Sequence, residues 1–205
     1  IICGNGLHFL GIVANNPIIL FFLTLIWNYG MINTFNFMDG IDGLVGGAGA
    51  IIAFFLLVLS LMSGNHFVSI VSLFLLSSCV GFLLFNYHPA SIFLGDVGSM
   101  FIGYNFAVLS VMITNQSRNS ISIYVFIILY AFMIYDAMTT FIRRGFEGKN
   151  VLEAHREHLY QRLVILGLTH RQVSLIYYMF CALFGVLAMT YLKVAVLAKI
   201  AIILS

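Results

Sequence analysis

The chain has 205 residues, of which 62% are apolar and only 8% are charged, compared with about 25% charged residues in an ordinary soluble domain. A mean hydropathy of +1.08 leaves too little polar surface to cover a soluble globule. The composition therefore excludes a cytosolic enzyme, a disordered tail and a nucleic-acid-binding protein. We expect an all-α, polytopic membrane protein that forms a single domain over residues 1–205 within the lipid bilayer.

The three cysteines, Cys3, Cys79 and Cys181, are widely separated, so the sequence predicts neither a disulfide framework nor a CxxC metal site. The chain opens with Ile-Ile-Cys, without an initiator methionine or the features of a signal peptide. We therefore expect it to be the C-terminal part of a longer protein.

Six apolar segments have the length of about 20 residues that a membrane-spanning helix needs. They are Pro17–Phe35, Leu44–Met62, Phe67–Phe85, Val97–Thr114, Ser120–Phe141 and Val173–Leu192. A seventh run, Val194–Leu204, is shorter and carries Lys199, so it is expected to be an interfacial end or a span that the fragment boundary cuts. The sequence thus predicts a helix bundle with about six to seven transmembrane helices.

The longest connection, residues 142–172, holds six of the nine basic residues and is predicted to be cytoplasmic by the positive-inside rule. Counting back through the spans, Asn36–Gly43 and Asn86–Asp96 fall on the same face. All seven carboxylates then lie toward the cytoplasm. A carboxylate at the centre of a spanning helix costs about 2.5–3.5 kcal/mol, so a cluster of aspartates near the spans suggests a function.

The first inner segment, Asn36–Leu44, places Asp39 and Asp42 three residues apart and runs into a stretch rich in glycine. If the segment is helical, its polar residues and several glycines share one face. The glycines Gly46, Gly47 and Gly49 are equally consistent with close packing between membrane helices. Packing alone does not explain two acids and an amide.

The second inner segment turns at Pro89 and re-enters the membrane just after Asp96, which lies between Gly95 and Gly98. This places a carboxylate at a helix N-terminus beside free backbone amides, a combination suited to a metal-bound phosphate. The alternative is that Asp96 only caps the helix.

In the third inner segment, Asp136 shares a helical face with Thr140 and Arg143, and pairing with a basic neighbour is the favoured interpretation of this acid. His155 and His158 follow, three residues apart on one helical face, and are candidates to bind a diphosphate. Two further interpretations stay open for this loop: a zinc site at the histidine pair, and a basic surface on anionic lipid headgroups. The remaining histidines, His8, His66, His88 and His170, are expected to be loop or interface residues.

The three segments, in this order and on one face, resemble the polyprenyl-phosphate N-acetylhexosamine-1-phosphate transferases, a superfamily of the glycosyltransferase family 4 type. The residues that carry the resemblance are Asn36–Leu44, Pro89–Ser99 and Ala154–Leu163. The third segment is closer to the branch that initiates O-antigen synthesis than to the phospho-MurNAc-pentapeptide translocase branch.

The resemblance implies that Asp96 ligates Mg²⁺, with Mn²⁺ as an alternative, and that Asn36, Asp39 and Asp42 line the nucleotide-sugar site. Asn86 and Phe93 match positions near the uracil ring. The loop positions thought to hold diphosphate and sugar are matched by His155, Arg156 and His158. Asp39, Asp42, Asp96, His155 and His158 are thus the candidate catalytic residues.

The implied reaction moves HexNAc-1-phosphate from a UDP-sugar to polyprenyl phosphate, such as undecaprenyl phosphate, and releases UMP. The active site would face the cytoplasm from the inner membrane, and a homodimer is compatible with the family. Family members carry an Asp-Asp motif in an earlier inner loop, so the 205 residues alone are expected to be inactive. The alternative function is a cation-coupled secondary transporter, which would need ionisable residues near mid-bilayer. A non-catalytic membrane scaffold is a third interpretation.

Overall fold

The computed structural model describes residues 8–9, 12–13, 16–115, 121–148 and 157–204. Most of this part of the chain is helical, and the rest consists of loops and one small antiparallel hairpin. The elements in chain order are β1 (His8–Phe9), β2 (Ile12–Val13), α1 (Pro17–Met38), α2 (Leu44–Ser63), α3 (His66–Asn86), α4 (Gly95–Thr114), α5 (Ile123–Leu129), α6 (Ala131–Phe146), α7 (Leu159–Ile165) and α8 (His170–Leu204).

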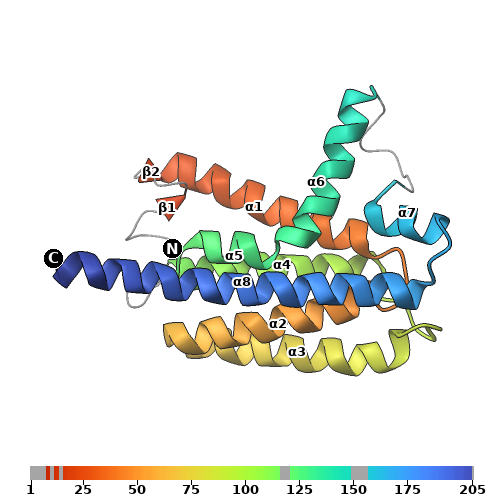
Figure 1. The fold of residues 1–205 in the computed structure, drawn as a ribbon, viewed down its shortest axis with the longest axis horizontal. Coiled ribbons are helices and arrows are strands. Elements are labelled where there is room, and N and C mark those ends of the chain that lie inside the picture. Colours follow the sequence, from red (N-terminus) through yellow and green to blue (C-terminus); the bar gives the residue numbers. More distant parts are fainter. Residues whose placement is uncertain (1–7, 10–11, 14–15, 116–120, 149–156, 205) are drawn as a thin grey trace.

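The long helices form an elongated bundle, with α2 packed against α3 and α8, and α1 packed against α4 (Figure 1). Five of the described helices are long and apolar enough to cross a membrane, and the number is six if the bent pair α5 and α6 is counted as one span. Many large apolar side chains face outward along these helices, as expected for surfaces that contact lipid. The predicted membrane helix bundle is confirmed.

The fifth predicted span, Ser120–Phe141, is not one straight helix. It is divided into α5 and α6, which meet at Tyr130 with a bend of 73°. The Tyr130 side chain is fully buried, and its hydroxyl donates a hydrogen bond to the Phe106 carbonyl oxygen at 3.1 Å. No proline or glycine marks the break, so local sequence does not indicate it. As a result α6 leaves the direction of the bundle (Figure 1).

The seventh apolar run is not a separate segment either. Residues Val194–Leu204 continue α8 without a break, so this helix extends over 35 residues.

Glycines in α2 allow neighbouring helices to approach closely. A Cβ on Gly47 would lie 2.0 Å from the Tyr178 ring of α8, and a Cβ on Gly49 would lie 3.3 Å from the Cys79 sulfur of α3. These close approaches agree with the packing interpretation of the glycines, since a side chain at Gly47 would displace the Tyr178 ring or the helix that carries it.

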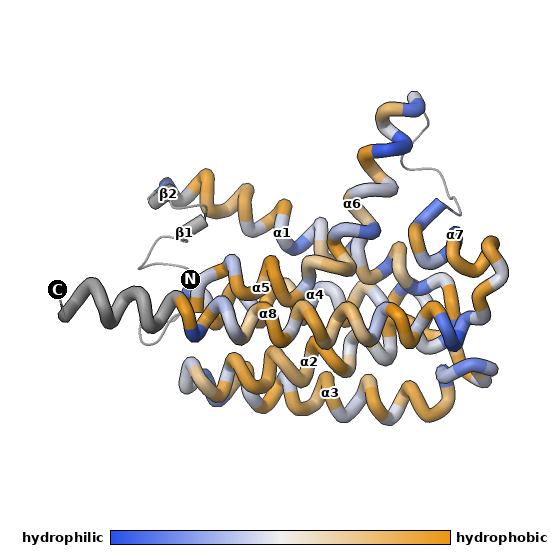
Figure 2. The backbone as a smooth tube through the Cα atoms, viewed as in Figure 1, coloured by the Kyte–Doolittle hydropathy of each residue, from blue (hydrophilic) through white to orange (hydrophobic). Residues whose placement is uncertain are grey.

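The loops that carry the acidic residues lie at one end of the bundle. This end contains the α1–α2 turn, the α3–α4 loop, α7 and the first residues of α8 (Figure 1). Figure 2 shows hydrophilic residues gathered around α7 and the start of α8, whereas the long helices are mostly hydrophobic. The expectation that the three inner segments share one face is met for the described residues.

Candidate active site

The first motif is not helical throughout. Helix α1 ends at Met38, Asp39 is its C-cap residue, and a short turn leads to α2 at Leu44. Gly43 closes this turn with φ of 78°, a left-handed conformation that glycine adopts without steric cost. The chain reverses here, so Asp39 and Asp42 do not share a helical face.

A hydrogen bond joins the first and second motifs. The Ser99 hydroxyl of α4 donates to Asn36 Oδ1 of α1 at 3.0 Å. Ser99 is fully buried, and its hydroxyl is also within hydrogen-bond distance of the Gly95 and Asp96 carbonyl oxygens. Asn36 therefore sets the position of the first turn of α4 relative to the end of α1.

Asp39 and Asp96 interact electrostatically across this contact. Burial raises the pKa of Asp39 to about 6; a hydrogen bond from the Gly95 N–H opposes the rise, and the charge of Asp96 adds to it. Asp96 lies in the first turn of α4, but the N-cap residue is Leu94, so capping does not explain Asp96. Asp96 is exposed at the helix N-terminus.

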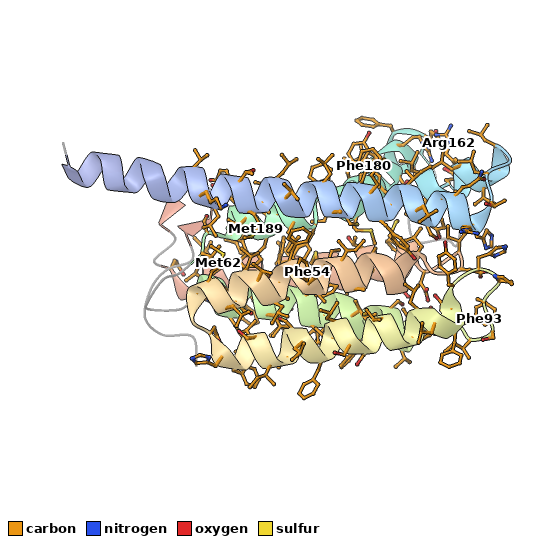
Figure 3. All side chains as sticks on the ribbon, turned by 60° about the horizontal axis from the view of Figure 1, so that its bottom comes forward. Phe54, Met62, Phe93, Arg162, Phe180 and Met189 are labelled. Atoms are coloured by element: carbon orange, nitrogen blue, oxygen red, sulfur yellow. The ribbon has the colours of Figure 1, made fainter. Side chains whose placement is uncertain are left out.

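Asn86 connects the α1–α2 turn to the α3–α4 loop. Its Oδ1 accepts a hydrogen bond from the Gly43 N–H at 2.9 Å, and its Nδ2 donates to the Ile92 carbonyl oxygen at 2.9 Å. Asn86 is 6% exposed, so its side-chain amide bonds to protein groups and is shielded from solvent. Next to Ile92, the Phe93 ring is 76% exposed at this end of the molecule (Figure 3). Asn86 therefore positions the loop that presents Phe93.

Asp42 points toward two histidines that the sequence interpretation placed among ordinary loop residues. Its Oδ2 lies 2.7 Å from His88 Nδ1 and 3.5 Å from His170 Nδ1, and accepts a hydrogen bond from the Ala90 N–H at 3.3 Å. Burial raises the pKa of Asp42, but the bonds from His88 and Ala90 and the nearby His170 outweigh it, so the pKa is below its usual value. Asp42 thus belongs to a second cluster, separate in its contacts from Asp39 and Asp96.

Asp136 has a structural role, as the sequence favoured, but its partners differ from those expected. The fully buried carboxylate accepts hydrogen bonds from the backbone N–H groups of Leu159 and Tyr160, at 2.7 and 3.4 Å, and from the Tyr177 hydroxyl. It therefore caps the N-terminus of α7 and ties this helix to α6 and α8. The expected partner Arg143 binds Glu157 instead, with Nη2 at 2.8 Å from the backbone oxygen.

His158 is buried beside Asp136. It is 3% exposed, its Nδ1 lies 3.5 Å from Asp136 Oδ1, and its ring stacks on Phe37. Tyr160 supports the same contact, because its hydroxyl donates to the Phe37 carbonyl oxygen at 3.0 Å. The third motif is thereby attached to the end of α1, two residues before Asp39.

The other candidates of the third motif, His155 and Arg156, lie outside the described residues. Immediately after them, Glu157 bridges Arg143 and Arg144, with the Arg144 Nη1 at 3.1 Å from Glu157 Oε1. These ion pairs attach the loop to the end of α6.

Sequence reasoning missed the histidines around Asp42 and the anchoring role of Tyr160 and Tyr177. His88 and Asp42 are 46 residues apart, and no local spacing links them. The sequence signal for Asp42, His88, Tyr160 and His170 was that they come from segments assigned to the same membrane face, whereas Tyr177 lies within a predicted span.

The chain is similar to a group of sugar-phosphate transferases. It is 35% identical over 166 residues to a probable undecaprenyl-phosphate N-acetylglucosaminyl 1-phosphate transferase of Bacillus subtilis, a match that covers 81% of this chain and 46% of the relative. It is 32% identical over 176 residues to a decaprenyl-phosphate N-acetylglucosaminephosphotransferase of Mycobacterium leprae, covering 77% and 44% of the two chains. A phospho-N-acetylmuramoyl-pentapeptide-transferase of Caldicellulosiruptor bescii is 28% identical over 189 residues, covering 88% and 57%.

The chain spans about half the length of these curated relatives. The sequence model of glycosyl transferase family 4 matches residues 2–114, which include the first two motifs. This chain belongs to glycosyl transferase family 4.

Proposed function

We propose that residues 1–205 form part of the transmembrane catalytic domain of an enzyme that transfers HexNAc-1-phosphate from a UDP-sugar to polyprenyl phosphate and releases UMP. The family membership and the names of the similar proteins support a polyprenyl-phosphate sugar-phosphate transferase. The observation that carries the proposal is the hydrogen bond from Ser99 to Asn36, which holds the motif that contains Asp96 against the motif that contains Asp39.

The Asp39–Asp96 pair suits a divalent cation. A half-buried carboxylate beside a second carboxylate is unfavourable when both are ionised, and a bound cation removes that penalty. Mg²⁺ typically takes one or two protein carboxylates and completes its shell with substrate phosphates and water. We therefore propose Asp96 as the Mg²⁺ ligand and Asp39 as its neighbour. The ion would neutralise the phosphate charge that develops during transfer.

The nucleotide part of the substrate would lie beside the α3–α4 loop. Phe93 offers an exposed ring face of the kind that stacks on a nucleobase. Asn86 holds this loop against the turn that contains Asp42, because both ends of its amide are bonded to backbone groups. Asn86 thus acts as a positioning residue in this proposal, whereas Phe93 contacts the uracil.

His158 would act by positioning in the described arrangement, since it is buried between Phe37 and Asp136. We propose that His155 and Arg156, which precede the anchored residues Glu157 and His158, face the diphosphate. The polar end of the bundle would lie at the cytoplasmic side of the membrane, where a nucleotide sugar is available.

The test uses the complete gene product in detergent or vesicles, with UDP-GlcNAc as a first donor, undecaprenyl phosphate and Mg²⁺. UMP release that needs both the lipid and Mg²⁺ is expected. The variant Asp96→Asn should lose more than about 100-fold of this activity, as expected when a charge that stabilises the transition state is removed. A matched control, Glu147→Gln on the exposed end of α6, should stay within twofold of the parent protein.

Unchanged UMP release by a correctly inserted Asp96→Asn protein would contradict the assigned role of Asp96. Cation-driven uptake into vesicles without any UMP release would instead support the transporter alternative.

A further inference from the structure

A second cluster of metal-ligand side chains lies in the same polar end, apart from the Asp39–Asp96 pair. Asp42, His88 and His170 come from the α1–α2 turn, the α3–α4 loop and the first residue of α8. One ligand atom from each residue lies within 4.8 Å of the other two. Neither the predicted transferase reaction nor its Mg²⁺ ligand accounts for the two imidazoles.

The geometry directs both rings at one carboxylate oxygen. His88 Nδ1 and His170 Nδ1 lie 2.7 and 3.5 Å from Asp42 Oδ2, and the two ring centroids are 5.3 Å apart. His170 Nδ1 is inaccessible to solvent, and among the described residues it approaches Asp42 Oδ2 without forming a well-aligned hydrogen bond. Two ligands bound at about 2.1 Å to one tetrahedral zinc ion are separated by about 3.4 Å. The 3.5 Å spacing between His170 and Asp42 is close to this value. The 2.7 Å contact between His88 and Asp42 is a hydrogen bond, which would have to open to the same separation when an ion binds.

Other contacts hold the three segments in place. The Ser174 hydroxyl, one turn after His170, donates to the Asp42 carbonyl oxygen at 2.9 Å. The Arg171 guanidinium lies over the Tyr87 ring, 5.7 Å from its centroid, and so links α8 to the residue that precedes His88. The Asp42 carboxylate is further oriented by the Ala90 N–H. The segments that carry Asp42, His88 and His170 are therefore held together by neighbouring residues, and the two imidazole rings are not needed for these contacts.

We propose that Asp42, His88 and His170 form a binding site for a divalent transition metal, with zinc as the best match. Two imidazoles and one carboxylate are typical zinc ligands, whereas Mg²⁺ and Ca²⁺ prefer oxygen donors. The His88 side chain is 41% exposed, so a fourth position is accessible to water or another ligand. A metal here would join the loops of the first and second motifs to α8.

The experiment measures metal binding directly, independently of the transferase reaction. The complete gene product, purified through a tag without histidine and stripped with a chelator, is titrated with Co²⁺ in the presence of excess Mg²⁺. The visible absorption of bound Co²⁺ should saturate at one equivalent and be displaced by Zn²⁺. His88→Gln and His170→Gln should each weaken binding at least about 100-fold, because loss of even a residue that orients a ligand costs 10–100-fold.

The matched control is His66→Gln, since His66 is exposed at the start of α3, at the other end of that helix. It should bind Co²⁺ as the parent protein does. His170→Cys provides a test that does not depend on loss of binding: a thiolate at this position should keep Co²⁺ bound and add an intense sulfur-to-metal absorption band.

The proposal is overturned if the parent protein binds no equivalent of Co²⁺, or if both glutamine variants bind it unchanged. Asp96→Asn should retain the site even though it loses UMP release, so failure of the transferase proposal and failure of this one are distinguishable.

Discussion

Asn36 accepts a hydrogen bond from the Ser99 hydroxyl at 3.0 Å, and this contact links two motifs that are 63 residues apart. One turn beyond Asn36 lies Asp39, and three residues before Ser99 lies Asp96. The bond therefore sets how the two carboxylates face each other at the polar end of the bundle.

Ser99→Ala removes the bond between the motifs and should lower the Mg²⁺-dependent rate of UMP release by about 10- to 100-fold, because small misplacements of catalytic groups are costly. Ser99→Thr retains the hydroxyl and should recover most of the rate. Ser77→Ala is the control, since its hydroxyl, among the residues that the structure describes, bonds to the Leu73 carbonyl oxygen of its own helix. Equal rates for Ser99→Ala and Ser77→Ala would show that the bond does not position the site.

Asp39→Asn should stabilise the metal-free protein at neutral pH. The folded state binds the Asp39 proton more tightly than the unfolded state, because its pKa rises from 3.8 to about 6. The parent protein therefore loses stability relative to the variant as the pH rises from about 4 to 6. Because the Asp39 carboxylate is partly exposed and solvent screens its charge, the loss should be about 1 kcal/mol rather than the value for a fully buried group. Thermal unfolding in detergent with chelator should show a higher midpoint for the variant at pH 7.5 and nearly equal midpoints at pH 4.

Addition of Mg²⁺ at pH 7.5 should reduce the difference in unfolding midpoint between Asp39→Asn and the parent protein. The reason is that the cation binds the folded parent protein and stabilises it by mass action. A variant that is less stable than the parent protein at pH 7.5 without metal would contradict the charged, desolvated environment assigned to Asp39.

Tyr177→Phe should destabilise the protein by about 1.5–3 kcal/mol, since the hydroxyl donates to a buried carboxylate. Asp136 would then be held mainly by the α7 amides, so amide exchange at Leu159 and Tyr160 should become faster. Tyr191→Phe on the same helix is the control, because that side chain is 40% exposed. Identical unfolding midpoints for the two variants would rule out the anchoring role of Tyr177.

Gly47→Ala should destabilise the bundle by about 1–3 kcal/mol, the usual cost of overpacking a filled core. The new methyl group would lie 2.0 Å from the Tyr178 ring, so that ring must move, which breaks the hydrogen bond from its hydroxyl to the Gly43 carbonyl oxygen, or α2 and α8 must separate. At Gly81, in α3, no neighbouring atom lies within 4 Å of an added Cβ. Gly81→Ala should therefore leave the unfolding midpoint unchanged or slightly higher, and a similar loss from both changes would contradict the packing role of Gly47.

Apolar length and charge position were sufficient to predict the membrane helices and the shared polar end. A long apolar segment has no favourable alternative to a helix in a bilayer, because each backbone N–H and C=O must be bonded within the segment. The sequence also indicated Asp39, Asp42 and Asp96 as candidate functional residues, because placing carboxylates beside apolar spans costs free energy.

The break at Tyr130, the grouping of Asp42 with His88 and His170, and the anchoring of α7 by Asp136 were decided only by tertiary structure. Each depends on a contact between residues distant in sequence, such as the Tyr130 hydroxyl with Phe106 or the Tyr177 hydroxyl with Asp136. Local patterns report which residues are polar or apolar, but the partner that satisfies a buried polar group is chosen by how the helices pack. For this chain, the sequence by itself determined which end of the bundle is polar, and the packing of α1, α4 and α8 determined which acid faces which partner.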